Sequence, residues 1–282
     1  MYITLSQNLS YCFGVERTLR LVAELLEQSP ETKYFMLGEI VHNEHVINDL
    51  KSKGLQVISE LEQIEAGGTV IIQSHGTARQ TLEILKARKI DFIDATCPMV
   101  KKIHTKICKL EAAGYFPVII GKQGHDEVQG IAGQVKEALI IGNAQGVKPD
   151  DFSGRKKVGI VVQSTYIRAN AVAILEKIKT LVPNVRFIDT ICRPTTERQA
   201  EVESIAGKFG FILIIGSKAS ANTRHLFKLA SGTKSHVYLV DDPESLRKLP
   251  IPPDATVFIA SGASTPMHLI EKIVSILTQK EA

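Results

Sequence analysis

The sequence predicts an α/β fold built from three similar units with mainly parallel sheets. Two observations lead to this fold class. Short β-branched runs alternate with amphipathic stretches, which is typical of parallel sheets covered by helices. The segments behind these runs also resemble one another at intervals of about 90 residues, and such a period indicates a repeated supersecondary unit.

The predicted strands are short apolar runs that end in small or polar residues. They lie at residues 2–5, 70–72, 118–120, 160–162, 212–215 and 257–259. Helices are expected directly after three cysteines, at residues 13–26, 98–110 and 195–206. The first of these has apolar residues close to a 3.6-residue period. Pro98 and Pro194 fit helix starts, because the first turn of a helix tolerates proline.

Three sets of polar clusters recur where strands end. One set follows Gly38, Gly121 and Gly216, a second contains Ser74, Ser164 and Ser261, and a third contains Cys12, Cys97 and Cys192. The cysteines are 85 and 95 residues apart. The predicted units, called repeats below, are residues 13–96, residues 97–192, and residues 193–282 together with the N-terminal segment 1–12.

The polar clusters predict where a ligand would bind. In open α/β sheets, ligands bind outside the carboxyl ends of the strands, and all the clusters fall there. If the three repeats turn these ends toward one axis, they form a pseudo-threefold trefoil with one cysteine from each repeat around a central cluster. Three independent domains with loops that face outward are the alternative.

Composition excludes several classes of protein. The chain has 282 residues, of which 44% are apolar and 23% charged, so it can bury a core and is not disordered. Its net charge of +4 is interspersed, which does not favour nucleic acid. The apolar runs fall far short of the roughly 20 residues that cross a bilayer. Since the first residues also lack a secretory leader, we expect a cytoplasmic protein without membrane or nucleic-acid partners.

The cysteines indicate a metal cluster rather than disulfides, which are rare in the reducing cytoplasm. Helix N-termini stabilise thiolates, and Cys12, Cys97 and Cys192 each precede a predicted helix. Their wide spacing disfavours a zinc ribbon. Three ligands would leave one iron of a [4Fe-4S] cluster open to a substrate, which suggests catalysis. Cys108 has no counterpart in the other repeats and is interpreted as a helix residue.

Further polar residues at the strand ends predict an anion site. Histidine, serine and asparagine donors near helix N-termini suit a phosphate or diphosphate. The candidates are His42, His75, His125, Ser220, Asn222 and Ser264. Glu127 is either a proton donor beside His125 or a charge in the first turn of the next helix, and both interpretations stay open. Asp94 and Asp189 are interpreted as structural.

These residues together resemble the LytB or IspH family, the 4-hydroxy-3-methylbut-2-enyl diphosphate reductases of isoprenoid synthesis. The resemblance covers essentially the whole chain in the family's order. It is carried by Cys12-Phe13-Gly14-Val15, Val41-His42-Asn43, Ser74-His75-Gly76, Asp94-Ala95-Thr96-Cys97-Pro98, Gly124-His125-Asp126-Glu127-Val128, Thr195-Thr196-Glu197-Arg198-Gln199 and Ser261-Gly262-Ala263-Ser264.

The resemblance implies a reductive dehydroxylation that yields isopentenyl and dimethylallyl diphosphates, the last step of the methylerythritol phosphate pathway. It implies that Cys12, Cys97 and Cys192 hold one [4Fe-4S] cluster and that Glu127 delivers protons. Ser164 or Thr165 would order the substrate hydroxyl. The diphosphate would bind His42, His75, His125, Ser220, Ala221 through its backbone N–H, Asn222 and Ser264. A ferredoxin or flavodoxin would donate electrons, and we expect a monomer.

The chain departs from the family's usual pattern at a few positions. Ser10-Tyr11 precedes Cys12 where Gly-Phe is common, Asp126 replaces a common proline, Ala221 a usual serine and Ser164 a usual threonine. Two other functions stay open: a noncatalytic iron-sulfur sensor, and an open-iron hydro-lyase that consumes no electrons. Reductant-dependent turnover would separate the reductase from both.

Overall fold

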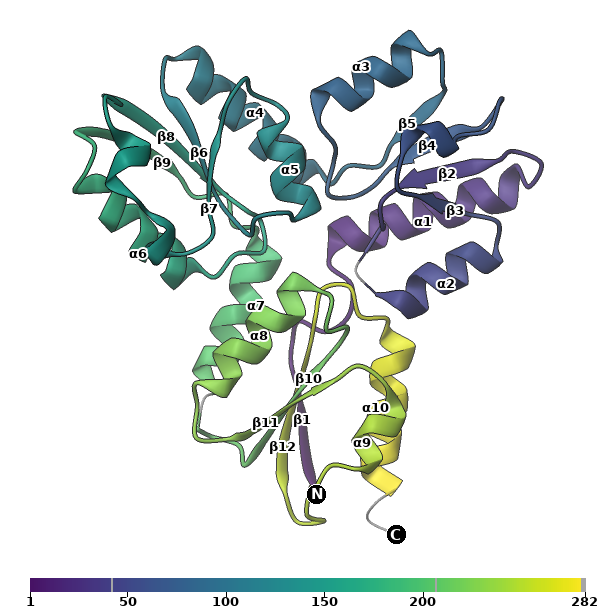
Figure 1. Cartoon of the computed structure of the whole chain (residues 1–282). Coiled ribbons are helices and arrows are strands. Elements are labelled where there is room, and N and C mark those ends of the chain that lie inside the picture. Colours follow the sequence, from purple (N-terminus) through teal and green to yellow (C-terminus); the bar gives the residue numbers. More distant parts are fainter. Residues whose placement is uncertain (42, 206, 280–282) are drawn as a thin grey trace. The chain divides into compact units, whose positions relative to one another are not determined.

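The computed structural model describes residues 1–41, 43–205 and 207–279 (Figure 1). By their internal contacts, the residues form two compact units. Unit 1 consists of Met1–Glu16, Val41–Asn48 and Arg193–Ala282, and unit 2 of Arg17–Ile40 and Asp49–Cys192. The boundaries of the three repeats, given above from the sequence, stay a prediction.

Unit 2 contains two four-stranded sheets in which every pairing is parallel. The first has the order β3-β2-β4-β5 and the second the order β7-β6-β8-β9. The strands of the first are β2 (Tyr34–Leu37), β3 (Gln56–Ile58), β4 (Thr69–Ile72) and β5 (Phe92–Asp94). Those of the second are β6 (Phe116–Ile120), β7 (Leu139–Ile141), β8 (Lys157–Val162) and β9 (Asn184–Ile188).

Unit 1 contains the third parallel sheet, with the order β1-β12-β10-β11. Its strands are β1 (Tyr2–Leu5), β10 (Phe211–Ile215), β11 (His236–Val240) and β12 (Thr256–Ser261). The strand order is the same in all three sheets when β1 takes the place of β5 and β9. The predicted fold class, three similar α/β repeats with parallel sheets, is therefore confirmed.

Helices connect the strands. They are α1 (Phe13–Gln28), α2 (Glu44–Ser52), α3 (Arg79–Ala87), α4 (Pro98–Ala112), α5 (Asp126–Ala132), α6 (Arg168–Lys179), α7 (Arg193–Ser204), α8 (Ala221–Ser231), α9 (Pro243–Arg247) and α10 (Met267–Gln279). Short 3-10 turns occupy Leu61–Gln63, Ala144–Gly146 and Pro149–Phe152. Helix α7 begins two residues before its predicted start, so Pro194 lies in its first turn, where proline is tolerated.

The cores lie on both faces of the sheets, because successive side chains of a strand point to opposite sides. In β8, Ile160 packs in one cluster with Ile174 of α6. The next residue, Val161, packs in another cluster with Ile107 of α4. Figure 1 shows α4 and α6 beside this sheet. A strand buried on both faces reads as a continuous apolar run, which is why these central strands are visible in the sequence.

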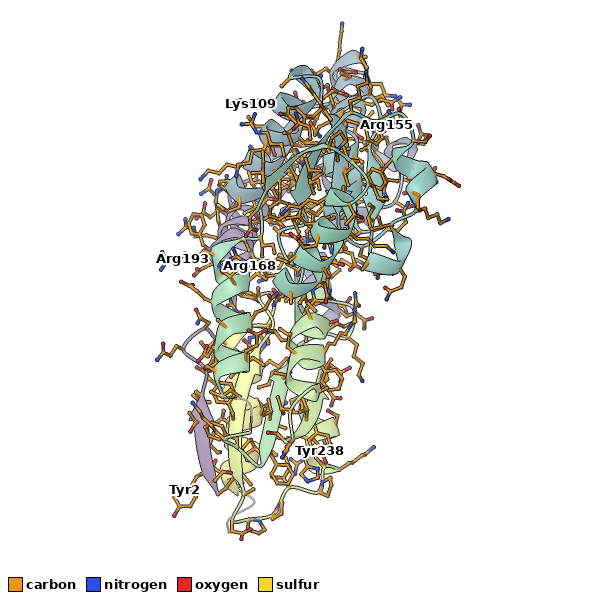
Figure 2. All side chains as sticks on the ribbon, turned by 90° about the vertical axis from the view of Figure 1, so that its left-hand side faces the viewer. Tyr2, Lys109, Arg155, Arg168, Arg193 and Tyr238 are labelled. Carbon is orange, nitrogen blue, oxygen red and sulfur yellow. The ribbon has the colours of Figure 1, made fainter. Side chains whose placement is uncertain are left out.

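The outer strand β1 is less enclosed than the central strands. Tyr2 is 76% exposed and points away from the sheet (Figure 2). Among the helices of the described residues, none combines the length and the apolar character that crossing a membrane requires.

Candidate functional site

Each of the three predicted cluster cysteines stands at the start of a helix. Cys97 is the N-cap of α4, and the carbonyl of Cys12 accepts the Glu16 N–H (3.0 Å) at the start of α1. Cys192 directly precedes α7. None of the three forms a disulfide, and all are partly exposed. Each thiol therefore lies where unpaired helical N–H groups favour negative charge.

The backbone N–H of each cysteine donates to a carbonyl in the loop behind a central strand. The pairs of N and O atoms are Cys12 with Ala263 (3.1 Å), Cys97 with Ser74 (3.0 Å) and Cys192 with Ser164 (2.9 Å). Two of these acceptors belong to the Gln-Ser segments that recur in the sequence. The three cysteine loops are thus fixed in the same way, each within one unit.

Asp94 and Asp189 brace the cysteine loops, in agreement with their structural interpretation. Asp94 Oδ1 accepts the N–H of Thr96 (3.0 Å), and Asp189 Oδ1 accepts that of Ile191 (3.1 Å). Burial alone would raise the pKa of Asp94, but hydrogen bonds from Lys101 and Thr96 hold this pKa below its ordinary value. The carboxylate is therefore ionised and locked in its turn.

The loop before Cys12 explains one departure from the family pattern. Ser10 has a φ of 64°, in the left-handed region that favours glycine. Its N–H is bonded to Ser261 Oγ (2.8 Å), its hydroxyl donates to the Thr265 carbonyl (3.1 Å), and its carbonyl accepts from Arg198 Nη2 (2.8 Å). These bonds hold a serine in a conformation that a glycine would adopt without strain.

The cysteines are divided between the units: Cys12 belongs to unit 1, and Cys97 and Cys192 belong to unit 2. Within the described ranges, no group of three His, Cys, Asp or Glu side chains is gathered closely enough to hold a metal ion. Cys108 lies within α4, where its thiol contacts the Gln134 carbonyl and Arg79 Nη2 at 3.6 Å each. It is a helix residue, as its lack of counterparts predicts.

Glu127 is almost completely enclosed, with 1% of its surface exposed. Its Oε1 accepts the N–H of Ser164 (2.6 Å), and its Oε2 lies 2.7 Å from Ser164 Oγ. Burial raises the pKa of Glu127, although both bonds to Ser164 work against this shift. A carboxyl with a raised pKa keeps its proton to a higher pH than an ordinary glutamate, which suits a general acid.

His75 and His125 meet edge to face in unit 2, with ring centroids 5.5 Å apart. His125 caps α5, and its Nδ1 accepts the Glu127 N–H (3.2 Å). His75 Nδ1 lies 2.8 Å from Gln73 Oε1, and Gln73 Nε2 donates to Asp126 Oδ2 (3.2 Å). Gln73 and Asp126 were not among the predicted site residues.

A second group of predicted site residues lies in unit 1. Ser264 and Ser220 are buried, with their hydroxyls 3.5 Å apart, and Ser220 caps α8. Asn222 is 5% exposed, and neither its amide nitrogen nor its amide oxygen has a hydrogen-bond partner. Because a buried amide without partners is costly, this side chain is poised for a ligand. Ala221 is buried beside it.

The remaining predicted residues are placed as follows. Thr165 Oγ1 accepts from Gln163 Nε2 (3.1 Å), and the Ser164 hydroxyl contacts Glu127 Oε2 (2.7 Å). His42 lies outside the described residues. Asn43, which was not predicted, donates through Nδ2 to the Ser264 carbonyl (3.0 Å) and is 2% exposed. The signal that could have identified Asn43 in the sequence was its position in the Val41-His42-Asn43 segment.

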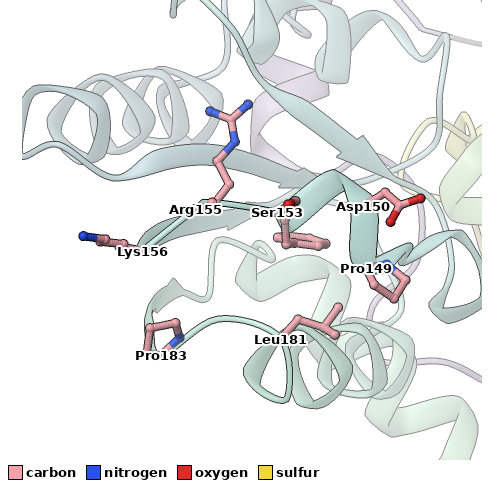
Figure 3. Close-up of a pocket in the computed structure, with 9 residues that line it drawn as sticks. Pro149, Asp150, Ser153, Arg155, Lys156, Leu181 and Pro183 are labelled. Carbon is pink, nitrogen blue, oxygen red and sulfur yellow. The ribbon is translucent and has the colours of Figure 1, made fainter.

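Unit 2 contains a cavity of about 730 Å³ whose lining includes Gly38, Gln73, Asp126 and Lys136. A second cavity, of about 470 Å³, is formed by residues around Phe152 and Leu181 (Figure 3). None of the predicted site residues lines the second cavity. Its Arg155 lies over the ring of Phe116 instead, at 3.5 Å from the ring centroid.

The family match and the similar sequences of known proteins agree with one another. The LytB protein family matches residues 3–278 of the chain. A 4-hydroxy-3-methylbut-2-enyl diphosphate reductase of Aquifex aeolicus is 34% identical over 279 residues, which cover 97% of this chain and 94% of the relative. The reductase of the same name from Caldanaerobacter subterraneus is 32% identical over 97% of this chain and 96% of its own length.

Solved structures of similar proteins have the same fold. The E-1-hydroxy-2-methyl-but-2-enyl-4-diphosphate reductase of Plasmodium falciparum matches with a TM-score of 0.89 and 28% identity, over 98% of this chain and 88% of that one. A structure described as (E)-4-hydroxy-3-methyl-but-2-enyl diphosphate reductase, the terminal enzyme of the non-mevalonate pathway, matches with a TM-score of 0.72 and 32% identity, over 99% of this chain and 100% of that one.

Proposed function

The chain belongs to the LytB protein family, and from that premise we propose that it is a 4-hydroxy-3-methylbut-2-enyl diphosphate reductase. The reaction is a reductive dehydroxylation: two electrons and two protons remove the allylic hydroxyl as water. The products are isopentenyl and dimethylallyl diphosphates. The relatives with this name align with nearly the whole chain, so the proposal applies to the complete described fold.

One observation carries the proposal. Ser164 binds Glu127 through its N–H and its hydroxyl, and its carbonyl accepts the N–H of Cys192. A single residue of unit 2 therefore joins a proposed cluster ligand to a buried carboxyl with a raised pKa. A proton source fixed beside a redox ligand is what a proton-coupled reduction requires.

Cys12, Cys97 and Cys192 are the proposed ligands of one [4Fe-4S] cluster. Their donor chemistry fits the group, because iron-sulfur clusters are held by thiolates and these three thiols stand at helix starts, outside any disulfide. The chemistry that the cluster supplies when bound is electron transfer and, at the iron without a protein ligand, Lewis acidity toward the substrate oxygen.

The proton of Glu127 has a defined position in this arrangement. A backbone N–H only donates, so Oε1 is held as an acceptor by Ser164. When Glu127 is protonated, its proton therefore lies on Oε2, 2.7 Å from Ser164 Oγ, to which it can be passed. The serine hydroxyl can turn its own hydrogen toward the substrate and receive a replacement from Glu127. Ser164 thus relays the proton from Glu127 to the leaving hydroxyl.

The diphosphate is proposed to bind the residues that the family resemblance implies. They are His75, His125, Ser220, Asn222 and Ser264, with the Ala221 N–H at the start of α8. The partnerless amide of Asn222 supports this role most directly, since a phosphate oxygen would satisfy its buried nitrogen. His42 is proposed from its motif alone.

The electron donor is proposed to be a ferredoxin or a flavodoxin, because the cluster accepts electrons singly. Cysteines outside disulfides fit a reducing compartment, so the cytoplasm remains the proposed location. A monomer remains our prediction for the oligomeric state.

The proposal is tested with cluster-loaded protein under anaerobic conditions. The assay follows substrate-dependent oxidation of a one-electron donor and identifies the diphosphate products. We expect both products from the wild type and loss of turnover in Glu127→Gln, with the cluster spectrum unchanged. Glu83→Gln, on an exposed position of α3, is the matched control and should retain turnover.

Three outcomes would contradict the proposal. Dehydration without reductant would indicate a hydro-lyase. Substrate binding without any turnover would indicate a noncatalytic sensor. Equal turnover of Glu127→Gln and the wild type would remove Glu127 from the proton path.

A further inference from the structure

Asn43 joins two segments of unit 1 that are far apart in the sequence. Its side chain is 2% exposed, and its Nδ2 donates to the Ser264 carbonyl (3.0 Å), 221 positions away. Its Oδ1 accepts the N–H of Val46 (3.4 Å) in the first turn of α2. One amide group therefore caps a helix and holds the loop that carries a predicted phosphate ligand.

The chemistry of the two partners fixes the orientation of this amide. A backbone N–H only donates and a carbonyl only accepts hydrogen bonds. The oxygen of Asn43 must therefore face Val46, and its NH₂ group must face Ser264. Because none of these groups titrates or has tautomers, the bond to Ser264 has the same direction at every pH at which the protein is folded.

The loop before α10 is held through three successive carbonyls, those of residues 263–265. Their donors are, in order, the Cys12 N–H (3.1 Å), Asn43 Nδ2 (3.0 Å) and the Ser10 hydroxyl (3.1 Å). The first and the third donor belong to the loop around a proposed cluster ligand. Asn43 is the donor that fixes the middle carbonyl, which belongs to Ser264.

The Ser264 hydroxyl can turn toward a ligand, because its contact with Ser220 Oγ is long, at 3.5 Å. Asn222, whose buried amide has no hydrogen-bond partner, follows Ser220 in the first turn of α8. A serine hydroxyl is only two bonds from its Cα atom, so its direction follows the backbone. The backbone of residue 264 is the part that Asn43 holds.

We propose that Asn43 is a positioning residue for diphosphate binding: by holding the Ser264 carbonyl, it keeps the Ser264 hydroxyl where a phosphate oxygen can accept its hydrogen. The phosphate ligand rests on the proposed function, whereas the bond between Asn43 and Ser264 belongs to the structure itself. Without the Asn43 donor, the buried carbonyl has to turn toward another partner, and the hydroxyl moves with it.

Two variants separate the helix cap from the contact with Ser264. Asn43→Ser keeps a cap for α2, because serine caps helices about as well as asparagine, but it has no second polar atom for the Ser264 carbonyl. Asn43→Ala removes both contacts. We therefore expect Asn43→Ala to unfold at a lower urea concentration than Asn43→Ser, whereas both should bind diphosphate equally weakly.

Asn143→Ala is the matched control. Asn143 is an exposed residue of unit 2, and its Oδ1 caps a 3-10 turn by accepting the Gly146 N–H (2.8 Å). The control thus removes the same kind of cap at a different place. It should leave the diphosphate affinity unchanged.

The affinity is measured by calorimetry with inorganic diphosphate and cluster-loaded protein under anaerobic conditions. We expect about threefold to tenfold weaker binding in both Asn43 variants, the range for one lost hydrogen bond. In turnover assays KM should rise by a similar factor, and kcat should change by less than about twofold, because the chemical step does not involve Asn43.

A double-mutant cycle tests whether Asn43 acts through the Ser264 hydroxyl. Ser264→Ala removes this hydroxyl and keeps the backbone carbonyl. When Asn43→Ser is added to Ser264→Ala, diphosphate binding should weaken by less than about twofold further, because the group that Asn43 positions is already gone. A direct contact of Asn43 with the phosphate would instead give the full factor in both backgrounds.

Two results would overturn the proposal: unchanged diphosphate affinity in both Asn43 variants, or an equal loss with and without the Ser264 hydroxyl. Neither depends on reductase activity. A protein that binds diphosphate as expected but does not turn over would contradict the proposed function and leave the positioning role intact. Turnover of the wild type with an unchanged KM in Asn43→Ser would contradict the positioning role alone.

Discussion

Ser164 uses its N–H, its hydroxyl and its carbonyl at the same time. The first two bind Glu127, and the third accepts the N–H of Cys192. Only the hydroxyl belongs to the side chain, so a substitution to alanine removes the proposed proton step and keeps both backbone bonds. Threonine, the usual residue of the family at this position, retains the hydroxyl.

We expect Ser164→Ala to lower kcat by about 10²-fold, because proton transfer by a positioned group contributes roughly 10²–10⁴-fold. Ser164→Thr should stay within about threefold of the wild type, since the hydroxyl is kept. The measurement is steady-state turnover with a one-electron donor at matched iron content. Equal kcat values for Ser164→Ala and the wild type would show that Glu127 reaches the substrate without Ser164.

The raised pKa of Glu127 predicts how stability depends on pH. A folded-state pKa above the unfolded value, 4.5, gives stability that is complete below 4.5 and lost as the pH rises through the folded-state value. Glu127→Gln removes this loss and can keep both contacts with Ser164. In denaturant titrations between about pH 5 and pH 8, the free energy of unfolding of Glu127→Gln should therefore rise relative to the wild type. A constant difference would mean that the pKa is not raised.

The site residues differ in how readily the sequence predicts them. Glu127 and Ser164 are 37 positions apart, and only their separate motifs marked them. Gln73 and Asp126 escaped prediction because their contact joins loops behind two different sheets. Asp126 was visible only as a departure from the family's proline. The role of a buried amide such as Gln73 cannot be predicted before the two side chains that it contacts are known.

At the scale of elements, the sequence predicts the central strands of the sheets better than the edge strands. Five of the six central strands, β4, β6, β8, β10 and β12, were predicted, because burial on both faces requires continuous apolar runs. The sixth, β2, was indicated only by Gly38 behind it, and among the edge strands β1 was predicted. The strands β3, β7 and β11, each at a sheet edge, were not. Their residues are mostly half-exposed, as in β3 and β7, so neither a run nor an alternation stands out.

The contact between α4 and β8 depends on a residue without a side chain. A Cβ at Gly159 would lie 2.9 Å from two carbon atoms of Leu110. We expect Gly159→Ala to lower the free energy of unfolding by about 1–3 kcal/mol, the usual cost of overpacking a core. Urea titrations of Gly159→Ala, Leu110→Ala and the double variant would give the coupling.

Leu110→Ala alone should cost about 2–5 kcal/mol through its cavity, and the double variant should cost less than both single variants together. Additive losses would show that Leu110 moves aside without strain.

At the scale of the molecule, the threefold repetition was the most predictable property. Three sheets with the same parallel order follow from segments that recur about every 90 residues. The division into two compact units was not predictable, because it depends on contacts among loops. Residues 41–48, for example, belong to unit 1 although both flanking segments belong to unit 2.

Removal of the proposed cluster should destabilise the protein, because a ligand that binds only the folded chain adds to its stability. A ligand that contributes about 3 kcal/mol to the folded state corresponds to a shift of roughly 6–12 °C in the unfolding temperature of a chain of this size. We expect that decrease in calorimetry after anaerobic chelation, and the same decrease with loss of iron in Cys12→Ser, Cys97→Ser or Cys192→Ser. Cys108→Ser is the matched control and should keep both iron and stability. Equal unfolding temperatures with and without iron would exclude this role.

The pairing of β1 with β12 has a consequence for biosynthesis. Tyr2 pairs with Thr256, so β1 leaves the ribosome 254 positions before its partner. At about 5–20 residues per second, this strand stays without that partner for roughly 10–50 s. During that interval its Ile3 and Leu5 are open to chaperones or to neighbouring nascent chains. The pairing of β1 forms only after β12 has been synthesised.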